Sequence, residues 1–116
     1  MTTNAWSAFT ISMPSAGTLT SAIDLQGNWE NVYLQIPPIT NTVFAIRASD
    51  TLTGTFARVK HPAINSSTLT VNDYLIASTS TNSVVPIPVG LRYVKVETEI
   101  AVADGATFKI LCGGGA

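Results

Sequence analysis

The chain has 116 residues, 46% of them hydrophobic and only 11% charged, with a formal net charge of −1 at pH 7, and this length fits one domain. Six dispersed Lys and Arg residues disfavour a nucleic-acid partner, and no apolar run approaches the roughly 20 residues that span a bilayer, which disfavours a membrane partner. One cysteine excludes an internal disulfide, and the N-terminus lacks the basic start of a secretory signal, so we expect a soluble protein that assembles in a cytoplasm.

The first segment, residues 1–17, carries no charged side chain. Its large apolar residues include Trp6, Phe9, Ile11 and Met13. Two interpretations of this segment stay open. It is either the first strand of its own domain or an arm that docks on another subunit by strand addition, with these four residues in the interface. If the segment is an arm, a chain that lacks it should still fold.

Beyond this segment, runs of β-branched and aromatic residues alternate with Gly, Pro, Asn and Asp at spacings of about 8 to 12 residues, which is typical of sandwiches and barrels. We expect strands at residues 6–12, 19–25, 31–36, 42–49, 55–60, 73–78, 83–87, 91–100 and 106–112. Residues 61–72 are polar and irregular, and we expect the longest loop there. The pattern predicts an all-β fold, an antiparallel two-sheet sandwich of jelly-roll type over residues 18–112.

The clearest strand is residues 91–100, where apolar and charged side chains alternate with a period of two. The Asp104-Gly105 pair then suits a tight turn, and residues 106–112 alternate again. Cys112 falls on the apolar side of this last strand, so we expect it in the core and not as a reactive thiol. Residues 113–116 should form a flexible tail.

No residue pattern indicates catalysis or metal binding. His61 is the single histidine and has no visible nucleophile to activate. Glu97 and Glu99 share the outward side of one strand with Lys95, and we expect a solvated row there instead of an acid–base pair. Asp50, in a loop with two threonines, is a weak calcium candidate, for which a plain turn is the simpler interpretation. We therefore expect no enzyme activity, no cofactor and no metal.

Outward aromatic residues are the remaining functional signal. Tyr33 and Tyr93 should lie on the outer sides of their strands, where tyrosine serves protein interfaces and also stacks on sugars. A carbohydrate-binding receptor module, with a surface glycan as partner, is therefore an alternative function. The low charge gives little repulsion between copies, which favours a subunit of a homo-oligomer or lattice.

Five stretches carry a resemblance to known proteins: AIDLQG (22–27), IPP (36–38), FAIRASD leading to GTF (44–56), GLRYVKV (90–96) and ATFKILC (106–112). In this order they resemble a family of small β-sandwich structural proteins of tailed bacteriophages and prophages. The resemblance implies a virion protein that decorates the capsid, forms a head fibre, or associates with the tail or baseplate. It implies other virion proteins as partners and assembly in the bacterial host cytoplasm. It supplies no catalytic residue.

Overall fold

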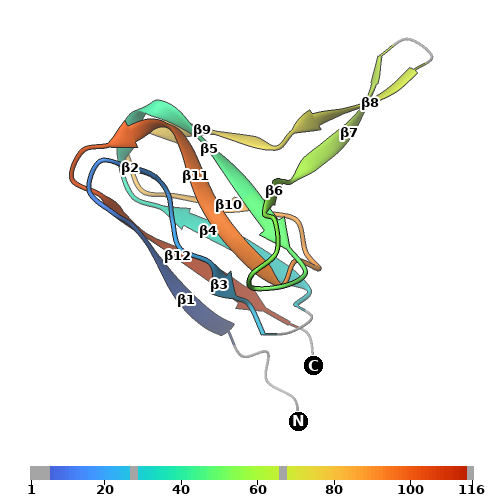
Figure 1. The fold of residues 1–116 in the computed structure, drawn as a ribbon, viewed down its shortest axis with the longest axis horizontal. Helices are drawn as coiled ribbons and strands as arrows, with labels where there is room; N and C mark the ends of the chain where they lie inside the picture. The colour runs from blue at the N-terminus through green and yellow to red at the C-terminus, as the bar shows by residue number, and fades with distance from the viewer. Residues whose placement is uncertain (1–5, 27–28, 66–67, 115–116) are drawn as a thin grey trace.

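The computed structural model describes residues 6–26, 29–65 and 68–114, which form two packed antiparallel sheets and a separate hairpin (Figure 1). The strands are β1 (Trp6–Met13), β2 (Gly17–Leu19), β3 (Ile23–Asp24), β4 (Asn31–Ile36), β5 (Ile39–Ser49), β6 (Ala57–Arg58), β7 (Lys60–Asn65), β8 (Thr68–Asp73), β9 (Leu75–Thr79), β10 (Ser83–Pro86), β11 (Tyr93–Val102) and β12 (Ala106–Gly113). The predicted all-β, two-sheet sandwich is confirmed. Among the described residues there is no helix that could cross a membrane.

The strand order is that of a jelly roll. The first sheet has the order β1-β12-β4-β10, and the second has the order β2-β11-β5-β6, with β3 also on β11 and β9 also on β5. When the short strands are grouped by their shared neighbour, eight strand positions result, with positions 1-8-3-6 in one sheet and 2-7-4-5 in the other. Strand positions 1 and 8, 2 and 7, 3 and 6, and 4 and 5 therefore pair with each other, as in one long hairpin wrapped around the sandwich. This is the topology of jelly rolls.

The core lies between the two sheets and follows from the period-two patterns in the sequence. Phe44 of β5 and Phe108 of β12 meet edge to face across it, with ring centroids 5.8 Å apart. Inward residues of these two strands and of the other long strands surround this pair: Ile11, Met13, Val32, Leu34, Ile36, Ile46, Val94, Val96, Ile110 and Cys112. Cys112 is fully buried, in agreement with its expected place in the core.

The N-terminal segment lies on its own sandwich. β1 pairs with β12 from Trp6 opposite Gly113 to Met13 opposite Ala106. Ile11 and Met13 are only 2% and 3% exposed, so they are part of the core of this chain. Removing residues 1–17 would therefore take an edge strand and two core side chains with it. Residues 1–5 and 115–116 lie outside the described residues, and the expected tail begins at the last residue of β12.

The expected loop over residues 61–72 is wrong, because this segment forms the antiparallel hairpin of β7 and β8, paired from Lys60 opposite Asp73 to Asn65 opposite Thr68. Polar β-branched residues made the segment look irregular, although threonine is a good strand former. The hairpin projects away from both sheets (Figure 1). In sequence the hairpin lies between β6 and β9. Both of these strands pair with β5, so the hairpin is an insertion in the fifth strand position.

The turn between β11 and β12 forms as the Asp-Gly pair predicts. Gly105 has a φ of 71°, and its N–H donates to the carbonyl of Val102 at 3.1 Å. A Cβ at this position would lie 2.6 Å from the carbonyl oxygen of Met13. Glycine is therefore required here both by the backbone conformation and by the close approach of β1.

Candidate interaction surfaces

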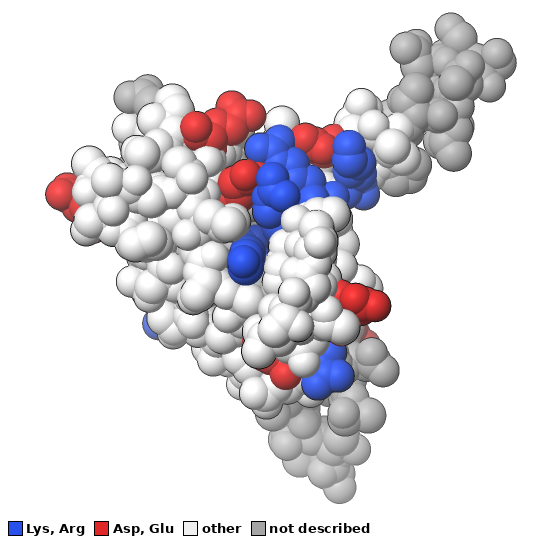
Figure 2. Space-filling model, viewed as in Figure 1, with Lys and Arg blue, Asp and Glu red and all other residues white. Residues whose placement is uncertain are grey.

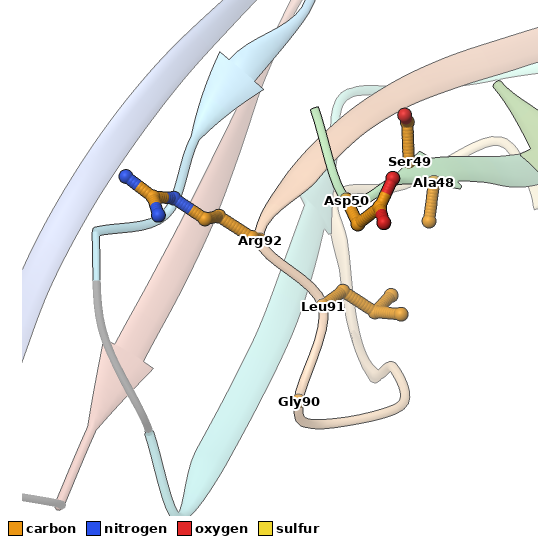
Figure 3. Close-up of a pocket in the computed structure, with 6 residues that line it drawn as sticks. All are labelled: Ala48, Ser49, Asp50, Gly90, Leu91 and Arg92. Carbon is orange, nitrogen blue, oxygen red and sulfur yellow. The ribbon is translucent and has the colours of Figure 1, made fainter. Parts of the chain in front are cut away.

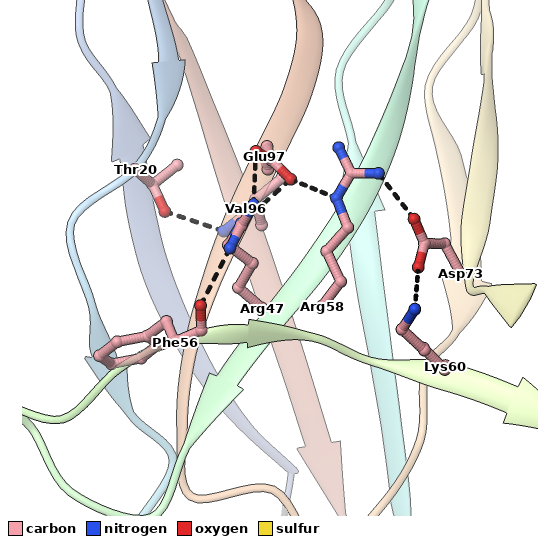
Figure 4. A network of polar contacts seen from close by, with 8 residues as sticks. All are labelled: Thr20, Arg47, Phe56, Arg58, Lys60, Asp73, Val96 and Glu97. Atoms are coloured by element: carbon pink, nitrogen blue, oxygen red, sulfur yellow. Dashed lines mark hydrogen bonds and ion pairs between the residues drawn. The ribbon is translucent and has the colours of Figure 1, made fainter. Parts of the chain in front are cut away.

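The projecting hairpin is tied to the second sheet by a chain of five charged side chains (Figure 4). Arg47 contacts Glu97 through two nitrogens, each 3.1 Å from a carboxylate oxygen. Arg58 donates from Nε to Glu97 at 2.7 Å and from Nη1 to Asp73 at 2.8 Å. Lys60 Nζ lies 3.2 Å from the other oxygen of Asp73. We call Arg47, Glu97, Arg58, Asp73 and Lys60 the charge chain.

The charge chain crosses the foot of the hairpin. Glu97 and Arg47 come from the central strands β11 and β5, Arg58 from β6, and Lys60 and Asp73 from the first and last residues of the hairpin. Figure 2 shows this gathering of blue and red at the foot of the hairpin, on a face that is otherwise mostly uncharged. Because the charges alternate in sign along the chain, each carboxylate bridges two cations. The arrangement fixes the direction in which the hairpin leaves the sheet.

The charge chain keeps its carboxylates ionised. The hydrogen bond from Arg58, together with that from Lys60, lowers the pKa of Asp73. Burial alone would raise the pKa of Glu97, but the hydrogen bonds from Arg47 and Arg58 outweigh it, and the pKa is lowered. Hydrogen bonds to Asp73 and Glu97 raise the pKa of Arg58. Both carboxylates are therefore charged at neutral pH.

Tyr74 supports the foot of the hairpin through one ring contact and two hydrogen bonds. The rings of His61 and Tyr74 meet edge to face with centroids 6.1 Å apart. The hydroxyl of Tyr74 donates to the carbonyl of Pro86 at 2.6 Å. The Tyr74 N–H also donates to the carbonyl of Val59 at 2.9 Å, which closes the base where the hairpin begins and ends. His61 thus has an aromatic neighbour, and it is exposed.

A second surface is the outer side of the first sheet. Register places Ala8, Leu111, Tyr33 and Pro86 in one row across all four strands. Trp6 lies beside this row, with its ring centroid 5.9 Å from that of Tyr33. Trp6 and this row form an apolar and aromatic centre, and we call the outer side of the first sheet around it the Trp6 face.

The six predicted interface residues separate in the structure. Trp6 and Tyr33 are brought together on the Trp6 face. Phe9 is half-buried and packs edge-on against Trp29, with ring centroids 6.5 Å apart. Ile11 and Met13 are core residues and are not available to a partner. Tyr93 lies on the opposite sheet, where Arg92 sits 5.1 Å from its ring centroid.

The expected solvated row of Glu97, Glu99 and Lys95 is wrong for two of its members. Glu97 is held between two arginines, and the ammonium of Lys95 lies 4.5 Å from the ring centroid of Phe56. Only Glu99 is exposed to solvent. The error arises because the partners of Glu97 lie on β5 and β6, which are distant in sequence.

An open pocket of about 380 Å³ lies at one end of the sandwich, between the end of β5 and the loop before β11 (Figure 3). Its lining residues are Ala48, Ser49, Asp50, Gly90, Leu91 and Arg92. Figure 3 shows Arg92 turned away toward β3, where its Nε lies 3.4 Å from Asp24 Oδ1. Asp50 is then the one carboxylate in a mostly apolar lining, and in the described residues no three His, Cys, Asp or Glu side chains group as metal ligands do.

Sequence reasoning missed the charge chain as a unit. Arg47, Arg58 and Glu97 were each placed on predicted strands, but strand order was needed to bring them together. The usable signal was the scarcity of charge: the chain has 13 charged residues, and five of them gather here.

Comparisons with protein-family models, with curated proteins and with solved structures find no match to this chain. The resemblance to phage structural proteins therefore stays a prediction from the sequence.

Proposed function

We propose that this chain is a non-enzymatic structural protein of a bacteriophage virion, a capsid decoration or head-fibre protein that attaches to the particle through protein–protein contacts. The resemblance of five stretches of the sequence supports this proposal, and so does the jelly-roll fold, which is widely used by viral capsid proteins. A tail or baseplate position is the alternative within the same class. The protein would fold in the host cytoplasm and join other virion proteins, in several copies of itself.

The observation that carries the proposal is the anchored hairpin. A two-stranded hairpin is at best marginally stable alone in water, and β7 and β8 pair only with each other. The protein nevertheless holds this hairpin away from its sandwich and fixes its base with five charges and a buttressing tyrosine. A recognition element that is already ordered loses less conformational entropy on binding. Such an element suits attachment to another protein better than it suits any role within the sandwich.

The hairpin also offers unpaired strand edges to a partner. Each strand pairs with the other along one edge, and no described residue pairs with the second edge of either, which suits strand addition, a common mode of protein recognition. The partner in this proposal is a protein of the particle with an exposed strand or groove.

The test is a variant in which the hairpin is replaced by a short glycine linker from Val59 to Tyr74. The direct hydrogen bond between these residues shows that their backbones are adjacent, so a short linker spans them. We expect the variant to keep its β-sheet circular dichroism and its cooperative unfolding. The full chain should co-purify with virus particles on a density gradient, and the variant should not.

The control is Leu52→Ser, which changes an exposed apolar residue in the loop after β5 and should leave particle binding intact. Absence of the full chain from purified particles would contradict the proposed function. Normal incorporation of the variant without the hairpin would refute the hairpin as the attachment site, while the protein would remain a virion component.

A further inference from the structure

The indole of Trp6 lies flat on the first sheet because the opposite residue has no side chain. Trp6 is the Cα partner of Gly113 in β12. A Cβ on Gly113 would lie 2.5 Å from two indole carbons, so the ring packs directly on the backbone of β12. Trp6 is nevertheless 55% exposed. The sheet therefore covers one side of the ring and leaves the other side open to solvent.

The sheet surface next to the indole is broad and apolar. Tyr33 is inclined by 36° to Trp6, with the ring centroids 5.9 Å apart, so the two rings form a broad floor and not the parallel walls of a groove. Leu111 and Pro86 continue this floor on either side of Tyr33. The floor follows the surface of the sheet, whose strands are about 5 Å apart.

Uncharged polar side chains border the floor. Asn31 lies opposite Gly113, in the row of Trp6, and Gln35 and Thr10 lie with Lys109 between them in the row on the far side of Tyr33. Within the described part of the chain, these side chains make no hydrogen bond to protein. Lys109 is the single charged residue among the outward positions of these four strands in the described residues. The face thus offers amide and hydroxyl groups to a ligand, with little charge.

We propose that the Trp6 face binds a neutral carbohydrate. The C–H side of a pyranose ring is flat and apolar and would lie on the open side of the indole, with the hydrophobic contact that aromatic rings provide. The hydroxyls around the sugar would pair with the amides of Asn31 and Gln35, each of which can both donate and accept.

A protein partner fits this face less well. An apolar protein surface laid over the floor would bury the amides of Asn31 and Gln35 without partners, which costs free energy for each group. A charged glycan would find little complementary charge, since Lys109 stands alone. A proline-rich peptide prefers a groove between aromatic walls, which the tilt of Trp6 and Tyr33 does not provide.

The proposal is independent of the virion assignment and is tested with the full chain on an array of neutral and acidic glycans. The best neutral glycan is then titrated in solution. We expect Trp6→Ala to lower its affinity about tenfold, as the loss of one aromatic contact implies. Gly113→Ala should have a similar effect with Trp6 still present, because the new methyl group lifts the indole from the sheet. The φ of Gly113 is not positive, so the backbone itself accepts alanine there.

Tyr93→Ala is the matched control, because it removes an aromatic side chain from the opposite sheet and should leave binding unchanged. Circular dichroism and unfolding of each variant establish that it is folded. No binding to neutral glycans, binding confined to acidic glycans, or binding that survives Trp6→Ala would each overturn the proposal. It would also be overturned by an oligomer that Trp6→Ala dissociates without any glycan signal, since a second copy would then be the occupant of the face.

Discussion

Glu97 is the residue on which the charge chain depends, and we expect Glu97→Gln to destabilise the protein. The carboxylate receives contacts at 3.1 Å from Arg47 and at 2.7 Å from Arg58, and its side chain is only 19% exposed. An exposed ion pair contributes about 0.2–1 kcal/mol, and breaking a fully buried one costs about 3–5 kcal/mol. Two partly buried pairs therefore place the loss at about 1–2 kcal/mol. For a domain of this size, the Tm should fall by about 4–10 °C.

The assay is thermal unfolding followed by circular dichroism, with Glu99→Gln as the control. Glu99 is on the same strand and is exposed, so its substitution should change the free energy of unfolding by less than about 0.5 kcal/mol. High salt should narrow the gap between wild type and Glu97→Gln, because it screens partly exposed charges. Equal Tm values for the two variants would refute the structural reasoning.

Acid provides a second check on the same residue. The pKa of Glu97 is lowered in the folded state, so its contribution to stability is present above the ordinary glutamate value of 4.5 and is lost as pH falls through the folded value. The stability difference between wild type and Glu97→Gln should therefore shrink below about pH 4.5. A difference that stays constant into strong acid would mean that the charge of Glu97 is not its cause.

Two further predictions concern the core and the turns. Burial raises the pKa of the Cys112 thiol, so it should resist a disulfide reagent at pH 8 in the native protein and react fully in denaturant; rapid native labelling would show that the core opens readily. Gly105→Ala should lower the free energy of unfolding, measured in urea, by at least twice as much as Gly90→Ala does. Both glycines have positive φ, a cost of about 1 kcal/mol for alanine, but the new Cβ meets the Met13 carbonyl at Gly105 and open space at Gly90. An equal loss of stability in the two variants would mean that the close approach of the Met13 carbonyl does not destabilise Gly105→Ala.

The sandwich could be predicted because its cause is local. In residues 91–100 the alternation of side chains requires one buried side, and the same holds for residues 31–36 and 106–112. The core position of Cys112 followed from the same pattern, and the turn at Gly105 followed from the Asp-Gly pair. These features depend on neighbours in sequence and need no knowledge of strand order.

The candidate surfaces depend on strand order and could not be derived in this way. Trp6 meets Gly113 because the first and last strands pair, and Arg47 meets Arg58 because β6 returns along β5. The hairpin was missed for another reason: its strands are rich in polar residues, so the hydrophobic signal that marks other strands is weak. Only the alternation of Leu69 and Val71 with threonine hinted at it.

The pairing of β1 with β12 also bears on how the chain folds during synthesis. Among the described strands of its sheet β1 pairs with β12 alone, and β12 is synthesised after all the other described strands. Until then β1, which carries the core residues Ile11 and Met13, has no strand with which to pair. Nested long-range pairing of this kind folds slowly, because distant segments must meet before any contact repays the lost chain entropy. The sandwich therefore closes only once β12 has been synthesised, because the edge strand β1 pairs with it.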